Sequence, residues 1–241
     1  MTVVRAEVVR ESQARQPSTF ALKVVMALTG VIFVAFVLVH MIGNLKVYGG
    51  AESLDGYARW LREVGYPLIP HSGVLWTLRI VLLTSLIAHV GASLVLWRRG
   101  RQARGRFRRR RTMTPTAWAA RTMLLGGLLI GAFVVVHLLD LTIGQVLAPG
   151  NHRHPDPDGT IHAYHNLVAS FSRPWMAAIY AGSMLVIAVH IWHGWRTVLQ
   201  DAGVTGRRLR AVWATLGALI AVAVVLGNAL IPVFVQLGVI A

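Results

Sequence analysis

The sequence predicts an all-α, polytopic membrane protein with five transmembrane helices. Five apolar stretches are each long enough to cross about 30 Å of hydrocarbon. Apolar residues make up 55% of the 241-residue chain, and only nine residues are acidic. So little polar side-chain surface does not cover a water-soluble protein of this length. We therefore expect a single transmembrane domain over residues 1–241.

The five expected spans are separated by connections of different composition. The spans cover approximately residues 20–45, 73–97, 117–147, 174–199 and 211–240. The first apolar run is longer than a signal-peptide core and has no obvious cleavage site, so we expect it to be retained. Pro174 suits the first turn of a helix, and Pro232 is expected to kink the last span or end it early.

The distribution of cations predicts the orientation. Lys23, the segment 98–111 with its nine arginines, and the segment 207–210 all fall on one membrane face. On the opposite face, acidic residues offset the few cations. The positive-inside rule then places the N-terminus in the cytoplasm and the C-terminus outside the plasma membrane.

The net charge of +15 has a simpler explanation than nucleic-acid binding. Basic clusters attract nucleic-acid phosphates, but juxtamembrane arginines also arise from the positive-inside bias and meet anionic lipid headgroups. We therefore expect the lipid bilayer, and no nucleic acid, as a partner. A protein with an acidic face could use the same cluster.

Four histidines lie inside the spans at two matched depths. At about 1.5 Å per helical residue, His40 and His137 both lie about 25 Å from the cytoplasmic boundary. On the same scale, His89 and His190 lie about 10 Å from it, so the two levels are about 15 Å apart. Because an imidazole is costly in lipid, these pairs predict two bis-histidine haem sites, one outer and one inner.

The residue inventory restricts the kind of haem. The chain has no cysteine, which excludes disulfides, thiolate zinc sites, iron–sulfur ligation and covalent c-type attachment. We therefore expect two non-covalent b-type haems. Two axial imidazoles leave no open iron position, which favours electron transfer over oxygen chemistry.

Glycines occur where a flat macrocycle needs room. Gly30, Gly126 and Gly127 precede the outer histidines of their own spans by ten or eleven residues, which places them at the inner level. Gly182 precedes His190 by eight residues and could serve the outer ring. Ordinary helix packing explains any single one of these glycines equally well.

The remaining histidines have other interpretations. His193 is the alternative inner ligand, because it lies one turn beyond His190 on the same face. His190 is deeper and matches His89 better. Solvated or gating roles suit the histidines of the outer connections better than a loop metal site; these are His71, His152, His154, His162 and His165.

Cations near the two boundaries are candidates for binding haem propionates. They are Arg121 and Arg196 at the inner level, and Lys46 and Arg79 at the outer level. Arg79 lies inside the second span, where a charge is expensive unless it meets an anion or snorkels outward. Asp140 in the outer part of the third span could pair with Arg79, assist proton transfer or be hydrated.

Several segments together resemble a known family. They are the run 38–45 with the sequence LVHMIGNL, the segment His89-Val90-Gly91, His137, and His190-x-x-His193-Gly194 followed by Gln200 and Gly203. This set resembles the cytochrome b membrane-anchor subunit of succinate:quinone oxidoreductases (succinate dehydrogenase and fumarate reductase), in its single-subunit, five-helix, two-haem type. The resemblance covers nearly the whole chain and departs from the family in the arginine-rich inner connection. It implies the same pairing of histidines and favours His190 over His193.

The resemblance implies a subunit of an enzyme shared by the respiratory chain and the tricarboxylic acid cycle. A flavoprotein subunit would oxidise succinate, and an iron–sulfur subunit would pass electrons to this anchor from the cytoplasmic side. The anchor's own reaction would be reduction of a quinone, expected to be menaquinone. A higher oligomer is compatible with this assignment.

Quinone reduction also needs protons, which residues at the outer rim could supply. The candidates are Glu63, Tyr57, Trp60 and His71. Glu63 is favoured because a carboxylate can shuttle protons. The alternative is that Glu63 only pairs with Arg59 or Arg62.

Two other functions remain open on the sequence alone. A cytochrome b of a hydrogenase or formate dehydrogenase would also use transmembrane histidines, although with different ligand spacing. A haem-free anchor or transporter would use the histidines to carry protons.

Overall fold

The computed structural model describes residues 17–106, 114–144, 147 and 150–241, and every regular element in these ranges is helical. Five helices are long and apolar enough to cross a membrane: α2 (Thr19–Asn44), α4 (Gly73–Arg104), α5 (Pro115–His137), α7 (Pro174–Asp201) and α8 (Arg207–Gln236). A π-helical turn, η2 (Leu138–Ile143), continues α5. The prediction of an all-helical chain with five membrane-length apolar helices is confirmed.

The helix ends lie within a few residues of the predicted ones, with three informative differences. The second span continues as helix to Arg104, so α4 includes the first arginines after the apolar stretch. The third ends at Ile143, where Gly144 adopts a φ of 73°. The last ends at Gln236, and Pro232 lies inside it without terminating it. The predicted end of the third span at 147 is next to residues outside the described ranges. Part of the arginine-rich segment, residues 107–111, lies outside them.

Local sequence signals explain where three of the long helices begin. Ser18 Oγ accepts a hydrogen bond from Ala21 N at 3.0 Å and caps α2. Thr114 caps α5 in the same way, with a proline in the first turn. Pro174 begins α7, as predicted.

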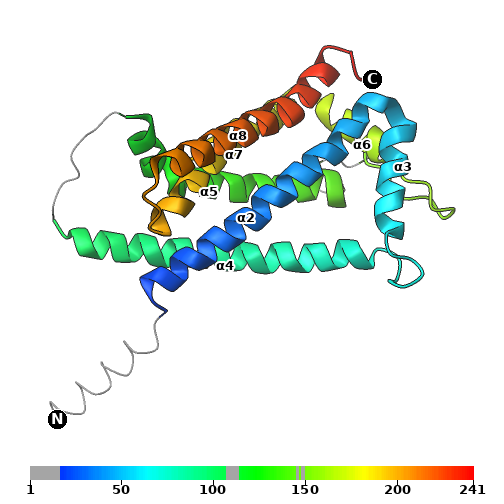
Figure 1. The fold of residues 1–241 in the computed structure, drawn as a ribbon. Helices are drawn as coiled ribbons and strands as arrows, with labels where there is room; N and C mark the ends of the chain where they lie inside the picture. The colour runs from blue at the N-terminus through cyan, green and yellow to red at the C-terminus, as the bar shows by residue number, and fades with distance from the viewer. Residues whose placement is uncertain (1–16, 107–113, 145–146, 148–149) are drawn as a thin grey trace, which may run out of the picture.

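Two short helices cover one end of the bundle, which we call the capped end. They are α3 (Gly50–Glu63), which follows the 3₁₀ turn η1 (Leu45–Gly49), and α6 (Ala163–Phe171). Both lie near the ends of α2 and α8 (Figure 1). The carboxylate of Asp55 accepts a hydrogen bond from Tyr164 N at 2.8 Å and joins α3 to α6. Neither helix is among the five predicted spans; α3 contains the segment with Arg59, Arg62 and Glu63, and α6 is an addition from the structure.

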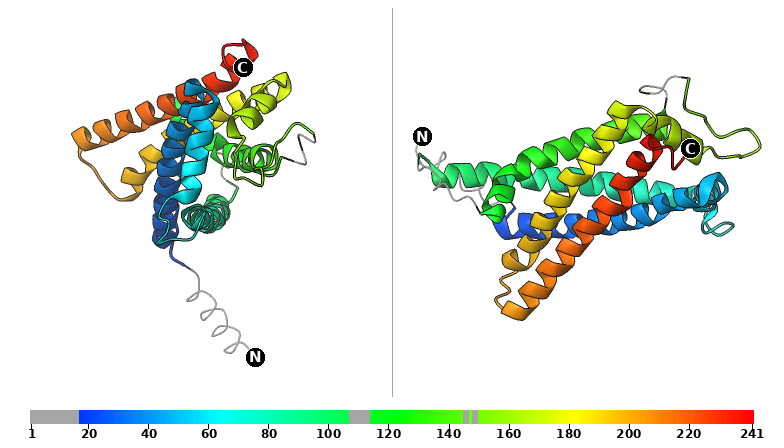
Figure 2. Two further views of the ribbon diagram at one scale, coloured as in Figure 1. Left: turned by 90° about the vertical axis from the view of Figure 1, so that its right-hand side faces the viewer. Right: turned by 90° about the horizontal axis from the view of Figure 1, so that it is seen from above.

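The opposite end, which we call the basic end, collects the start of α2 and the ends of α4 and α7. Lys23 Nζ lies 2.6 Å from Asp201 Oδ1, and Arg99 donates to the carbonyl of Pro17 at 2.9 Å. α2 packs on α4, α5 packs on α7, and α7 and α8 form a tightly packed hairpin. This hairpin diverges from the other long helices toward the basic end (Figure 2).

Most of the fully buried apolar side chains lie toward the capped end. They include Val47, Leu54, Leu167, Phe171, Ile231 and Ile240, drawn from η1, α3, α6, α8 and the chain end. Gln236 also donates to the carbonyl of Phe171 at 2.5 Å. The capped end therefore holds the helices in a fixed arrangement.

A tryptophan pair joins α7 to α8 at the basic end. The rings of Trp195 and Trp213 stack with centres 4.4 Å apart. Each indole N–H donates to the other residue's carbonyl, at 3.1 and 2.6 Å. Gly217 makes room for this pair, because a Cβ there would lie 2.5 Å from Trp195 Cδ1.

We expect Gly217→Ala to lower the melting temperature of the protein in detergent, because the added methyl group overpacks the tryptophan pair. Overpacking of this kind typically costs about 1–3 kcal/mol. Gly100→Ala is the matched control, because a Cβ at this exposed helical site meets nothing within 4 Å. Equal melting temperatures for the two variants would contradict the role assigned to Gly217.

Candidate functional site

Four histidines from four helices form two facing pairs inside the bundle. His40 of α2 faces His137 at the end of α5, with ring centres 5.9 Å apart and ring planes at 84°. His89 of α4 faces His190 of α7 at 6.4 Å. These are the pairs that depth counting predicts. In the described ranges, His193 makes no such ring contact with His89.

The positions of two glycines give the distance between the two histidine pairs along the bundle. A Cβ on Gly30 would lie 3.8 Å from His89 Cε1, and a Cβ on Gly127 would lie 3.7 Å from His190 Cε1. Each glycine therefore marks the level of the inner pair on a helix that carries an outer histidine. That histidine follows ten residues later, which corresponds to a rise of about 15 Å. The structure reproduces the expected separation of the two levels.

The ring spacing fits a metal ion held between two imidazoles. A metal–nitrogen bond of about 2.0 Å, with about 1.2 Å more from nitrogen to ring centre, places two axial rings about 6.4 Å apart. The observed spacings are 5.9 and 6.4 Å. In the described parts of the chain, no group of three or more metal-binding side chains occurs. Two imidazoles alone do not complete a coordination shell, which is what a porphyrin would provide.

The helices leave room between the facing histidines. α2 and α5 carry the outer histidine pair, and α4 and α7 carry the inner pair. Neither α2 with α5 nor α4 with α7 is among the closely packed helices. Gly30 and Gly127 present bare backbone at the inner level, and a Cβ on Gly182 would meet nothing within 4 Å. His40, four residues before the end of the apolar helix α2, is exposed. This arrangement fits a flat group between the histidines.

A threonine hydroxyl sets the tautomer of His89. Thr29 Oγ1 lies 2.8 Å from His89 Nδ1 and donates its own proton to the carbonyl of Val25 at 2.7 Å. The hydroxyl therefore accepts a hydrogen bond from Nδ1–H. As a result, the Nε2 lone pair of His89 is free to bind a metal ion.

A tyrosine has the same effect on His137. Tyr180 OH donates to Asp140 Oδ2 at 3.1 Å and lies 3.3 Å from His137 Nδ1. Because its proton is engaged by the carboxylate, the tyrosine oxygen accepts from Nδ1–H. One histidine of each pair thus has Nδ1 protonated and Nε2 available, as in metal-bound histidines with an outer hydrogen-bond partner.

Asp140 is buried in an ion pair that the sequence analysis did not predict. It is only 1% exposed, and its carboxylate also accepts hydrogen bonds from Ser170 and from Arg173, each at 2.5 Å. The predictions that Asp140 pairs with Arg79 or is hydrated are therefore both wrong. The reason is that α6 and the start of α7 bring Arg173 against the third span.

The four cations predicted to bind propionates lie on α4, η1, α5 and α7. Arg79 is exposed on α4, with its guanidinium 4.7 Å from the ring centre of Trp76. Lys46 is exposed in η1, and Arg121 is exposed in the first half of α5. The guanidinium of Arg196 lies 5.4 Å from the ring centre of Trp192, between the inner pair and the basic end.

The candidate proton donors for a quinone fall into two groups. The ring of Tyr57 packs on Gly43, one turn beyond His40, and stacks with Trp60 at 5.7 Å. Glu63 and His71 lie farther away, where α3 leads toward α4. In the described ranges, Glu63 forms no ion pair, so its proposed pairing with Arg59 or Arg62 is not observed.

The histidines of the 150–165 segment do not gather into a metal site among the described residues. His152 and His154 have ring centres 5.1 Å apart, and His162 lies 2.9 Å from Asp156. Burial, followed by the proximity of His154, lowers the pKa of His152. A neutral imidazole at this position is consistent with an ordinary loop residue.

Sequence reasoning missed the hydroxyl partners of the histidines and the ion pair behind them. Tyr180 precedes His190 by ten residues, the same offset that separates the two levels on α2 and α5. That offset could have placed Tyr180 beside the outer pair. The role of Thr29 and the position of Arg173 depend on helix rotation and on α6, which no local pattern reveals.

Comparisons of the chain with protein-family models, curated proteins and solved structures find no match. The functional assignment therefore depends on the residues and on their geometry.

We expect Asp140→Asn to destabilise the protein strongly, because it leaves the partly buried Arg173 without its counter-charge. Breaking a buried pair typically costs about 3–5 kcal/mol. Thermal unfolding in detergent would measure the loss. Asp158→Asn is the control, because this exposed loop carboxylate forms no ion pair in the described ranges. Equal melting temperatures for the two variants would refute the structural role of the ion pair.

Proposed function

We propose that this chain is the dihaem cytochrome b membrane anchor of a succinate:quinone oxidoreductase. His40 and His137 would hold one b-type haem, and His89 and His190 the other. The observation that supports this most is the pair of hydroxyl contacts, which leave one histidine of each facing pair with a free Nε2 lone pair. Two such pairs about 15 Å apart suit electron transfer along the bundle.

Haem with two imidazole ligands supplies one-electron transfer. The role of this chain would be to hold and orient the two imidazoles of each pair. Thr29 and Tyr180 fix the ring orientation of His89 and His137, and such outer partners commonly matter almost as much as the ligands. The apolar helices around the pairs exclude water.

The two ends of the bundle suit different partners. The basic end would face the cytoplasm and receive the iron–sulfur subunit, which carries electrons from the flavoprotein subunit that oxidises succinate. The capped end would face the outside of the plasma membrane. This orientation rests on the positive-inside rule.

Quinone reduction is assigned to the capped end. Tyr57 and Trp60 form an aromatic surface within a turn of His40, which suits the flat ring of menaquinone. Glu63 is exposed on the same helix and forms no ion pair in the described ranges, so it is the proposed proton donor.

One observation favours a second candidate function. The chain of hydrogen bonds from Arg173 through Asp140 and Tyr180 to His137 could carry protons in a haem-free membrane protein. A hydrogenase or formate dehydrogenase cytochrome b remains a further alternative within the haem-binding class. Reduced-minus-oxidised spectra of the purified protein separate the haem-free alternative from the proposal, because only a cytochrome shows b-type absorbance.

We expect the purified protein to contain two haems b per chain. His40→Ala or His137→Ala should remove one haem, and His89→Ala or His190→Ala should remove the other, because each iron would lose an axial ligand. Pyridine haemochrome assays would give the stoichiometry, and redox titration would identify the haem that remains.

His193→Ala is the matched control for these variants, because it removes an imidazole one turn from His190 on the same helix. It should retain both haems. Full retention of both haems in the His40 and His137 variants would contradict the proposed pairing.

We expect Glu63→Gln to lower succinate:quinone reductase activity of the assembled complex by about tenfold or more, because a proton donor is lost. Haem content should be unchanged. Glu52→Gln removes an exposed carboxylate in the first turn of the same helix and serves as the control. Normal turnover of the Glu63 variant would exclude Glu63 from the quinone reaction.

A further inference from the structure

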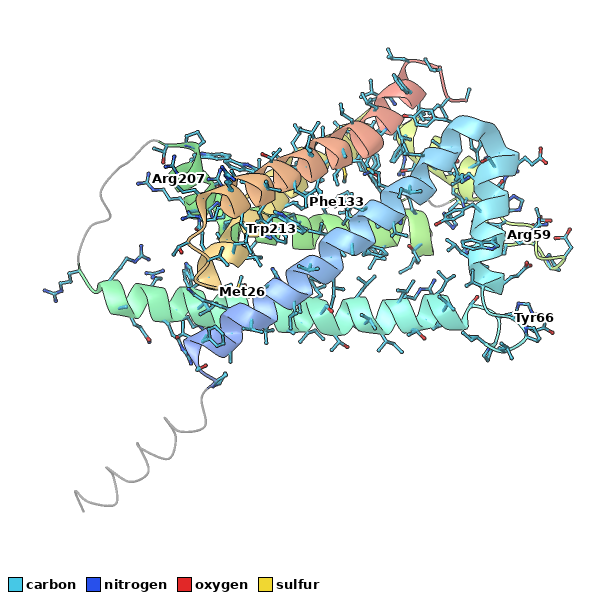
Figure 3. The ribbon with its side chains drawn as sticks, in the orientation of Figure 1. Met26, Arg59, Tyr66, Phe133, Arg207 and Trp213 are labelled. Carbon is cyan, nitrogen blue, oxygen red and sulfur yellow. The ribbon has the colours of Figure 1, made fainter. Side chains whose placement is uncertain are left out.

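A cavity of about 290 Å³ lies between α7 and α8 at the basic end. Its polar lining includes Arg196 and Gln200 of α7 and Arg207 and Arg210 of α8, and its apolar lining includes Leu199 and Trp213. Arg207 and Trp213 both lie at this end of the hairpin (Figure 3). None of the four proposed axial histidines lines it, and Arg196 is the one propionate candidate that does.

The three arginines of this cavity lack a counter-charge. In the described ranges, ion pairs join Lys23 to Asp201, His162 to Asp156 and Arg173 to Asp140, and none includes an arginine of the cavity. Asp201 is close in sequence to Gln200, but Lys23 occupies its carboxylate at 2.6 Å. Three guanidinium groups around one hollow form a site for an anion with several acceptor oxygens, such as a phosphate.

The surroundings of the cavity indicate an amphiphilic occupant. Ala211 and Ala214 add to the apolar lining. Together with Leu199 and Trp213, they give the cavity an apolar wall beside its arginines.

The walls of the cavity are held in place before anything binds. The stacked Trp195–Trp213 pair, with its two reciprocal hydrogen bonds, fixes the separation of α7 and α8 beside the cavity. A preformed site loses less conformational entropy when it binds a ligand.

We propose that this cavity binds the phosphate headgroup of an anionic phospholipid, with the start of its apolar part against Leu199 and Trp213. Basic pockets between transmembrane helices on the cytoplasmic side commonly receive such headgroups. A free phosphate would leave the apolar lining unused. The inference does not depend on haem binding.

Native mass spectrometry of the full chain, with phosphatidylglycerol titrated into phosphatidylcholine–detergent micelles, tests the proposal. The double variant Arg207→Gln/Arg210→Gln should weaken phosphatidylglycerol binding by about fivefold for each guanidinium removed. The matched control Arg104→Gln/Arg208→Gln removes two exposed cations from the basic end that do not line the cavity, and it should bind normally. Equal weakening in both variants would reduce the site to general surface charge and overturn the proposal.

A cavity-filling variant and two further measurements distinguish lipid binding from the other possible occupants. Ala214→Trp fills the cavity without changing the charge and should also weaken binding. Inorganic phosphate should not displace the lipid at equal concentration, and full displacement would identify a small-anion site instead. Loss of co-purifying polypeptides from the arginine variant, with lipid binding unchanged, would identify a protein-docking site and overturn the proposal.

Discussion

The structure depends on how an imidazole is accommodated inside an apolar helix bundle. A buried polar ring is costly unless its nitrogen atoms have partners. In each facing pair, a hydroxyl whose own proton is already engaged accepts a hydrogen bond from Nδ1 of one histidine. That constraint fixes the ring and the tautomer together, and it leaves the lone pair of the other nitrogen free.

The helix packing follows the same requirement. Helices that carry facing histidines are kept apart, whereas each packs closely against a helix of the other pair. The separation is maintained at the two ends. The Asp140–Arg173 ion pair and the buried apolar cluster hold the capped end, and the tryptophan pair joins α7 to α8 at the basic end. These contacts at the two ends keep the arrangement of the helices in place.

The two ends have different chemistry, which gives the bundle a direction. The capped end has a packed core beneath α3 and α6, with an aromatic surface next to His40. At the basic end, three arginines that have no ion-pair partner among the described residues line a cavity between α7 and α8. In the proposed function, quinone chemistry belongs to the first end, and contacts with lipid and the iron–sulfur subunit belong to the second.

The sequence by itself determined the five apolar helices and the two histidine levels, because hydrophobic length and a fixed rise per residue need no tertiary information. It also placed Gly30 and Gly127 at the inner level for the same reason. Only the tertiary structure decided that Arg173, rather than Arg79, neutralises Asp140, and that Thr29 and Tyr180 support the histidines. These contacts depend on how each helix is rotated about its axis and on α6. Both are set by packing between segments far apart in the chain.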